Sequence, residues 1–380
     1  MPEKRYLMTP GPTPAPPQVL AALSAPVIHH RARDYRELFE TLLHRLGEVF
    51  QTRHDVLVYT CSGTGGMESA ITNVCRPGER VLVVSAGYFG ERFGEIARAY
   101  GCDVMELRYD WGETPSADDL RARIDETAPA VVLLTHSETS TGVVADLQAL
   151  SAACGDSLVV CDAISSLGAI PLETDAWGVD VVVTGSQKAL MTPPGLAAVS
   201  VSETAWERSR IAGLPRYYFD WERVRTAQAR FDAAFTPAVS LVGGLNVALG
   251  LILEEGLEAV FERHIRLGRA CREGIKAMGL ELFSPDEDRS AVVTAVSVPE
   301  EIDSGALVAT IRDRFGITLA PGQGPLKGRI FRIGHIGYYD IFDITTALAG
   351  VELALAEMGA DIERGVAVGR ALEVFEHTTV

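Results

Sequence analysis

Hydrophobic residues in the first 201 positions of this chain come in short runs, separated by polar segments of helical length. Runs of this kind are typical of strands that are buried on both faces, as in a parallel sheet covered by helices. The alternation therefore predicts an α/β fold with a mostly parallel sheet. The predicted strands are residues 56–59, 80–85, 103–107, 130–135, 157–161, 180–184 and 197–201, and the predicted helices between them are 65–75, 88–100, 116–125 and 146–154.

The order of elements changes after residue 255. A long helix over 255–278 is followed by a mixture of strands and helices, which predicts a smaller α+β domain. Its predicted strands are 291–298, 317–319 and 330–333, and its predicted helices are 304–315 and 340–358. We therefore expect a large domain over residues 16–255 and a small domain formed by residues 1–15 and 256–380.

One segment, 233–253, carries no formal charge and is long enough to span a bilayer. It contains Thr236, Pro237 and Asn246, and polar or helix-breaking residues are costly when they face lipid. We predict a loop followed by a helix that is buried in protein, at a subunit or domain interface. The N-terminal residues show no long apolar stretch, so we expect a cytoplasmic protein without a membrane partner.

Charge and cysteine content narrow the range of partners. The formal net charge is -17, from 34 Lys and Arg against 51 Asp and Glu, and this disfavours nucleic acid as a partner. The six cysteines lack the paired spacing of metal ligands. We therefore expect reduced, mostly buried thiols and no metal site.

Lys188 is the first candidate for chemistry. It follows the predicted strand 180–184 and precedes the turn signal Pro193-Pro194-Gly195, so its neighbours are small, apolar or turn-forming. Burial there would lower the pKa of the amine and make it a nucleophile. A surface lysine at a junction between strand and loop is the alternative interpretation.

A second candidate is the glycine-rich segment 60–68, which follows a predicted strand and opens a predicted helix. Backbone N–H groups and the hydroxyls of Ser62 and Thr64 can bind a phosphate at such a helix start. The segment lacks the lysine of a nucleoside-triphosphate loop and the spacing of a dinucleotide fingerprint. A helix start without any ligand is equally compatible with this pattern.

Asp162 is the third candidate, at the end of a strongly apolar run. A carboxylate buried there must be paired or hydrogen-bonded to stay ionised, and no basic residue is adjacent to it in the sequence. A protonated heterocyclic nitrogen would be a fitting partner. The alternative is a helix N-cap, which the presence of Lys188 makes less favourable.

These segments resemble the class V aminotransferases that depend on pyridoxal 5'-phosphate, and in particular the alanine/serine:glyoxylate (serine:pyruvate) group. The resemblance runs along nearly the whole chain. Its motifs are Thr9-Pro10-Gly11-Pro12-Thr13, Ser62-Gly63-Thr64, His136-Ser137-Glu138-Thr139-Ser140-Thr141-Gly142, Asp162, Gly185-Ser186-Gln187-Lys188-Ala189-Leu190, Thr236-Pro237 and Arg332-Ile333-Gly334-His335-Ile336-Gly337. It implies fold type I, the α/β architecture of these enzymes, with pyridoxal 5'-phosphate as cofactor.

The resemblance also implies roles for individual residues. Lys188 would form the Schiff base and move the proton, while Asp162 would bind the pyridinium nitrogen. Arg332 would bind the substrate α-carboxylate, with the backbone of Gly11 closing over it. The remaining implied cofactor contacts are Ser62, Gly63, Thr64 and Gln187 at the phosphate, Phe89 and Ile164 on the two faces of the ring, and Thr139 near the ring oxygen.

Thr236 matches a family position that reaches the phosphate of the neighbouring subunit, so the resemblance implies a homodimer with active sites at the interface. Phe89 stands where relatives often have Trp, and the adjacent Tyr88 leaves its alignment uncertain by one residue. His136 and His335 belong to family motifs, and we expect both to form structural hydrogen bonds.

The implied reaction is a ping-pong transfer of the amino group of alanine or serine to glyoxylate or pyruvate. A 2-aminoethylphosphonate:pyruvate aminotransferase shares the His136-Ser137-Glu138-Thr139 and Asp162-Ala163 patterns, and an aspartate aminotransferase is a further alternative. A fold type I lyase is another alternative, although a desulfurase needs a reactive late cysteine and Cys271 falls in a predicted helix. A non-catalytic accessory subunit is the alternative from a different class. The side-chain pocket, which could include Tyr217 and Tyr218, is not defined by the sequence.

Overall fold

The computed structural model describes residues 4–287 and 290–377, and all seven strands predicted for the first part of the chain are present. They form one sheet in the order β2-β10-β9-β8-β5-β3-β4. The bounds are β2 (Asp55–Tyr59), β3 (Arg80–Ser85), β4 (Asp103–Arg108), β5 (Val131–Thr135), β8 (Leu158–Asp162), β9 (Val181–Gly185) and β10 (Ala197–Val201).

The sheet is mostly parallel, as predicted. Strand β10 is antiparallel to both of its neighbours, with Val199 opposite Val183 on one side and Leu57 on the other. The pairs β9 with β8, β8 with β5, β5 with β3 and β3 with β4 are parallel. The carboxyl ends of the parallel strands therefore meet at one edge of the sheet, where ligands bind in folds of this kind.

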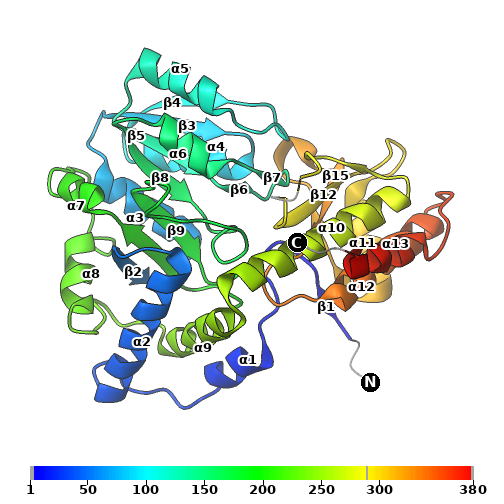
Figure 1. The fold of residues 1–380 in the computed structure, drawn as a ribbon, viewed down its shortest axis with the longest axis horizontal. Coiled ribbons are helices and arrows are strands. Elements are labelled where there is room, and N and C mark those ends of the chain that lie inside the picture. The colour runs from blue at the N-terminus through cyan, green and yellow to red at the C-terminus, as the bar shows by residue number, and fades with distance from the viewer. Residues whose placement is uncertain (1–3, 288–289, 378–380) are drawn as a thin grey trace.

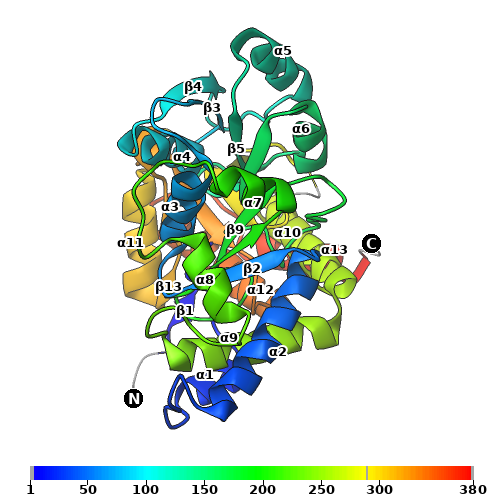
Figure 2. The ribbon, with the colours of Figure 1, turned by 90° about the vertical axis from the view of Figure 1, so that its left-hand side faces the viewer.

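Both faces of this sheet are buried, because successive side chains of a strand point to opposite sides. Leu82, Val132 and Val182 belong to one apolar cluster, whereas the neighbouring Val81 and Val131 belong to another. The first cluster includes side chains of α2 (Arg33–Phe50), α5 (Ala117–Thr127), α6 (Leu147–Ala153) and α9 (Val239–Glu255), and the second those of α3 (Gly63–Val74), α4 (Tyr88–Ala99), α7 (Glu203–Ser209) and α8 (Trp221–Gln228). Figure 2 shows α3 and α8 on one side of the strands and α2 on the other.

The C-terminal part is built around an antiparallel sheet in the order β11-β12-β15-β14 (Figure 1, yellow to red). Its strands are β11 (Glu281–Leu282), β12 (Val293–Ser297), β14 (Ala320–Pro321) and β15 (Ile330–Gly334), and its helices are α10 (Leu257–Ala277), α11 (Ser304–Phe315), α12 (Ile341–Glu357) and α13 (Val366–His377). These helices share one apolar cluster with the sheet.

The N-terminal segment joins this C-terminal part. Strand β1 (Tyr6–Leu7) pairs in parallel with β13 (Ile317–Thr318), after which the chain passes through α1 (Pro17–Leu23), which packs against α9. The domain boundaries at residues 15 and 255 stay a prediction, although α9 ends at Glu255 and the chain bends by 88° into α10.

The uncharged segment 233–253 forms a loop followed by α9, as predicted. No single helix among the described residues is long and apolar enough to cross a membrane, and α9 and α10 meet that test only as a pair, across their bend. Helices α1, α2, α7, α8 and α13 were not predicted, nor were the two-residue strands β1, β6 (Ser137–Glu138), β7 (Val143–Val144), β11 and β14. A strand of two residues is too short to show an alternating pattern.

Candidate active site

A cavity of about 330 Å³ lies beyond the carboxyl ends of β8 and β9, next to the start of α3. Nine of the twelve predicted site residues line it, namely Gly11, Ser62, Gly63, Thr64, Phe89, Asp162, Ile164, Gln187 and Lys188. Three others, Thr139, Thr236 and Arg332, are not among its lining residues. The cavity is also lined by Pro12, Met67, Arg92, Ser137, Ser165 and Pro194.

Lys188 is buried at this cavity rather than exposed on the surface. Its Nζ donates a hydrogen bond to the carbonyl oxygen of Pro10 at 2.8 Å, and its own carbonyl accepts one from the Thr13 hydroxyl at 2.9 Å. Burial lowers the pKa of the Lys188 amine from 10.5 to about 8, and the charge of Arg332 acts in the same direction. A useful fraction of the amine is therefore neutral near physiological pH.

Gly11 packs directly on this lysine. A Cβ atom at Gly11 would lie 2.4 Å from Cε of Lys188, and the backbone φ of +150° is one that L side chains rarely adopt. The N-terminal segment can therefore cover the lysine only because residue 11 is glycine.

Asp162 is the last residue of β8 and is 5% exposed. Its Oδ1 accepts a hydrogen bond from the Ile164 N–H at 2.9 Å, and a run of turns follows instead of an α-helix, so the N-cap alternative does not apply. Burial raises the pKa of Asp162 to about 7, and the charges of Lys188 and Arg92 oppose this rise. A cationic ligand group in the cavity would hold the carboxylate ionised.

Ser62 is the N-cap of α3, yet its side chain makes no capping hydrogen bond. The first N–H groups of a helix have no partner within the helix, so those of Gly63 and Thr64 are suited to an anion. Buried polar atoms also lie around this cavity without a hydrogen-bond partner among the described residues, namely Gln187 Oε1 and Ser137 Oγ. The N–H groups of Gly63 and Thr64 and the hydroxyl groups are donors that fit a phosphate, to which Gln187 would present its side-chain NH2 group and not Oε1.

Phe89 and Ile164 present apolar side chains to the cavity from two different elements. Phe89 lies in the first turn of α4, and Ile164 follows β8. Phe89, and not the adjacent Tyr88, lines the cavity. A Cβ atom at Gly63 would lie 2.5 Å from Cδ1 of Ile164, so a larger residue at position 63 would displace that side chain.

Arg332 lies on β15 and is 5% exposed. Its Nη1 donates to the carbonyl oxygen of Thr139 at 2.7 Å, and its Nη2 donates to that of Pro321 at 2.7 Å. Burial lowers the pKa of Arg332 to about 10. Thr139 thus contacts the arginine through its carbonyl group, whereas the resemblance implied a role for its hydroxyl.

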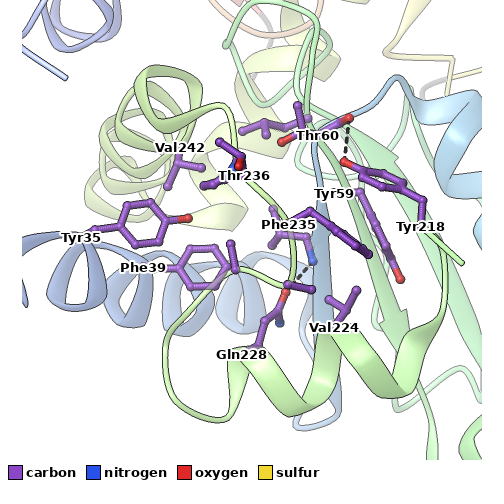
Figure 3. Close-up of a pocket in the computed structure, with 15 residues that line it drawn as sticks. Tyr35, Phe39, Tyr59, Thr60, Tyr218, Val224, Gln228, Phe235, Thr236 and Val242 are labelled. Atoms are coloured by element: carbon purple, nitrogen blue, oxygen red, sulfur yellow. Dashed lines mark hydrogen bonds between the residues drawn. The ribbon is translucent and has the colours of Figure 1, made fainter. Parts of the chain in front are cut away.

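Thr236 lies in a different pocket, about 30 Å³ in volume and surrounded by Tyr59, Tyr218 and Phe235 (Figure 3). Thr236 itself is exposed. Its segment is tied to Thr60, whose hydroxyl accepts a hydrogen bond from the Ala238 N–H at 3.0 Å. Neither Tyr218 nor Tyr217 lines the cavity of Lys188.

Of the two motif histidines, His335 fits the prediction, because its Nδ1 lies 2.9 Å from the carbonyl oxygen of Ala291 and its Nε2 lies 3.0 Å from the Thr294 hydroxyl. His136 packs edge-on against Trp177, and its Nδ1 has no hydrogen-bond partner among the described residues. The predicted structural hydrogen bond is therefore wrong for this nitrogen.

Glu138 belongs to the motif of residues 136–142, and the resemblance implies no role for it. It is 3% exposed, and its Oε2 accepts hydrogen bonds from the N–H groups of Phe89 and Gly90 at 2.9 and 3.0 Å. Burial raises the pKa of this carboxyl. The sequence signal for its importance is an acidic residue three positions after a buried strand, in a segment rich in Ser and Thr.

All six cysteines are free thiols, five buried and Cys61 partly exposed. Within the described ranges, no group of three or more His, Cys, Asp or Glu side chains could hold a metal ion.

Comparison with known proteins agrees with this geometry. The family model for class V aminotransferases matches residues 5–327. The chain is 42% identical over 365 residues to a protein named soluble hydrogenase, small subunit, from a Synechococcus strain, with 94% of this chain and 95% of that protein covered. It is 37% identical over 392 residues to the L-aspartate–glyoxylate aminotransferase of Paracoccus denitrificans, covering 100% and 98% of the two chains.

A solved structure, the ureidoglycine–glyoxylate aminotransferase from Bacillus subtilis, superposes with a TM-score of 0.95 at 34% identity, over 99% of each chain. This similarity confirms the predicted fold type I architecture, a mostly parallel α/β sheet with a smaller C-terminal α+β part. The family match, the full-length relatives and the cavity with its buried lysine together show that this chain belongs to the class V aminotransferase family.

Proposed function

We propose that this protein is an aminotransferase that uses pyridoxal 5'-phosphate and transfers the amino group of a small amino acid to glyoxylate or pyruvate by a ping-pong mechanism. The observation that supports this most directly is the cavity itself. The buried amine of Lys188 and the buried carboxyl group of Asp162 line this cavity together with the residues at the start of α3. An amine, an acid and an anion site are the three groups that this cofactor needs.

The residues present fit the cofactor. Ser62, Gly63, Thr64 and Gln187 would hold its phosphate, with Gln187 donating from its side-chain NH2 group. Asp162 would bind the protonated ring nitrogen, which would account for a buried carboxylate that has no ion pair among the described residues. Phe89 and Ile164 would contact the two faces of the ring. When bound, the cofactor supplies a conjugated, electron-withdrawing ring that eases removal of the proton from the donor Cα.

Lys188 would both attach the cofactor and move the proton. With a pKa of about 8, its amine can accept a proton and return it at modest cost, which is the requirement for a general base and acid. The hydrogen bond to the Pro10 carbonyl holds Nζ at the cavity wall, beside Gly11 and Pro12 of the N-terminal segment.

Arg332 would bind the α-carboxylate of either substrate. A guanidinium has five N–H donors, and the three hydrogen bonds to Thr139 and Pro321 leave donors free for a carboxylate. Gly11, which closes over Lys188, would lie beside the same carboxylate.

Alanine or serine is the proposed donor, as the resemblance to the alanine/serine:glyoxylate group implies. Aspartate is the second candidate. Arg92 lines the cavity and stacks on the Tyr88 and Phe89 rings, at 4.9 and 5.1 Å from their centroids, so its charge could meet a side-chain carboxylate. A relative named for aspartate and glyoxylate is consistent with this donor.

We further propose a homodimer in which Thr236 contacts the phosphate in the partner's site. Thr236 is exposed and does not line the cavity of its own chain, while its segment is hydrogen-bonded to Thr60, beside the proposed phosphate-binding loop.

The free cysteines are compatible with the proposed cytoplasmic location. The pairing of β1 with β13 supports the assignment of residues 1–15 to the small domain.

The test is to purify this chain alone, add pyridoxal 5'-phosphate, and measure keto-acid and amino-acid products. Alanine, serine, aspartate and 2-aminoethylphosphonate are paired in turn with glyoxylate, pyruvate and 2-oxoglutarate. We expect turnover with alanine or serine and glyoxylate, and none in Lys188→Ala. Cofactor binding without transamination by any pair would overturn the proposal in favour of a lyase or an accessory subunit, a role that the hydrogenase-subunit name of one relative leaves open.

A further inference from the structure

We propose that Glu138 is a positioning residue for this reaction: its carboxylate fixes the helix start that presents Phe89 and the loop that holds Arg332. The inference rests on the proposed function. It assigns a role to a buried acid that does not line the cofactor cavity.

One carboxylate oxygen caps α4 from outside the helix. The N-cap of α4 is Gly87, which has no side chain, and Oε2 of Glu138 accepts from the Phe89 and Gly90 N–H groups instead. A negative charge at a helix N-terminus is stabilising. A Cβ atom at Gly87 would lie 2.6 Å from Cγ of Glu138, so the glycine makes room for the distant acid. Phe89 is therefore held through its own backbone by Glu138.

The second oxygen fixes the loop 136–142. Oε1 accepts hydrogen bonds from the N–H group of Ser140 at 3.2 Å and from its hydroxyl at 2.5 Å. The same hydroxyl accepts one from the Tyr88 N–H at 3.0 Å, which ties the loop to α4 a second time. Thr139 lies between Glu138 and Ser140, and its carbonyl is the oxygen that receives Nη1 of Arg332.

The chain of contacts thus runs from the Phe89 backbone through Glu138 to Arg332. Three of the four hydrogen bonds to the carboxylate come from backbone N–H groups, which can only donate, and the fourth involves the Ser140 hydroxyl, so this arrangement favours the ionised, acceptor-only form against the effect of burial. Its buried negative charge also acts on Lys188, Asp162 and Arg332. A shift of this one side chain would move the ring-stacking residue and the carboxylate-binding residue together.

The decisive variant is Glu138→Gln, which keeps the shape but turns one acceptor into a donor facing N–H groups. Glu352→Gln is its matched control. Glu352 is 4% exposed and accepts hydrogen bonds from the Gly365 and Ala367 N–H groups at the start of α13, in the C-terminal part of the chain. Both variants remove a buried acid that caps a helix, but α13 contributes no residue to the cavity, whereas α4 contributes Phe89 and Arg92.

For both holoenzymes we would measure KM and kcat, the circular dichroism of the bound cofactor, cofactor affinity of the apoenzyme by titration, and Tm. We expect Tm to be lower in both variants than in the unmodified protein. Only Glu138→Gln should raise KM for the donor and for the acceptor, by about tenfold, which is the effect of losing one charged hydrogen bond. The same variant should also bind the cofactor more weakly and change the circular dichroism of the bound cofactor.

An unchanged KM, affinity and dichroism in Glu138→Gln, with a lowered Tm, would show a purely structural role and overturn the inference. If that variant does not fold, Ser140→Ala decides, because it removes only the hydroxyl contacts to Glu138 and Tyr88 and should shift KM and dichroism in the same direction. Absence of transamination in the unmodified protein would instead refute the proposed function, whatever the variants do.

Discussion

The side-chain Nζ of Lys188 and the carbonyl oxygen of Pro10 are hydrogen-bonded at 2.8 Å, although 178 positions separate them in the chain. Pro10 belongs to the N-terminal segment, whose strand β1 pairs with β13 of the C-terminal part. The Lys188 amine therefore lies where the N-terminal segment meets the large sheet. Its environment depends on how the N-terminal segment packs.

Gly11→Ala tests this packing. The added methyl group would overlap Cε of Lys188 and require an unfavourable φ, so we expect activity to fall by at least about tenfold, the effect of roughly 1.4 kcal/mol. Steady-state kinetics with the holoenzyme check this. Gly369→Ala is the control, because a Cβ there meets nothing within 4 Å. Equal activity of the two variants would contradict the proposed closure over Lys188.

Lys188→Ala should abolish the covalent link to the cofactor. Borohydride treatment followed by mass spectrometry should show a permanent adduct in the unmodified protein and none in the variant. Loss of a proton-transferring group should lower the rate about hundredfold or more. A variant that kept full activity would refute the assigned role.

The buried amine also predicts a pH effect on the stability of the cofactor-free protein. Because the pKa of Lys188 falls from 10.5 to about 8 on folding, the unfolded chain binds more protons between these values, and the contribution of Lys188 to stability increases as pH rises from 8 to 10.5. Below pH 8 the folded protein must bury a charged amine. Lys188→Ala removes this cost, so the Tm of the variant minus the Tm of the unmodified apoprotein should be largest near pH 7 and should decrease toward pH 10. Calorimetry measures this difference. A constant difference would mean that Lys188 titrates normally.

Asp162→Asn should retain the hydrogen bond to the Ile164 N–H but lose the charge. A charge-assisted hydrogen bond is worth about 1.5 kcal/mol more than a neutral one, so we expect kcat to fall about tenfold or more and cofactor binding to weaken. Asp180→Asn serves as the comparison, since Asp180 accepts from the Val159 N–H at the opposite end of the same strands. Similar losses in both would point to a general effect on the sheet.

Thr236 allows a test of the shared site. In a mixture of Lys188→Ala and Thr236→Ala chains, a mixed dimer has one site with both native residues and one with neither. If Thr236 acts on the partner's site, a mixture refolded together should be more active than the same chains refolded apart. Size-exclusion chromatography would check for the dimer, and additive activities of the two variants would place Thr236 in its own chain's site or in none.

Much of the fold could be predicted because local patterns suffice for it. Apolar runs such as those of β8 and β9 are buried on both faces, and their chemically distinctive residues stand at the strand ends. Since parallel strands end at one edge of the sheet, Asp162 and Lys188 had to come close once that topology formed. The cavity that they share follows from the same rule.

What the sequence by itself determined, then, was the order of strands and helices and the identity of the groups at one sheet edge. Only the tertiary structure decided that Phe89 rather than Tyr88 lines the cavity, that Thr236 lies outside it, and that Glu138 caps a helix that begins 50 residues earlier in the chain. These facts depend on contacts between distant segments, which hydrogen bonding and side-chain packing select and which no local pattern records.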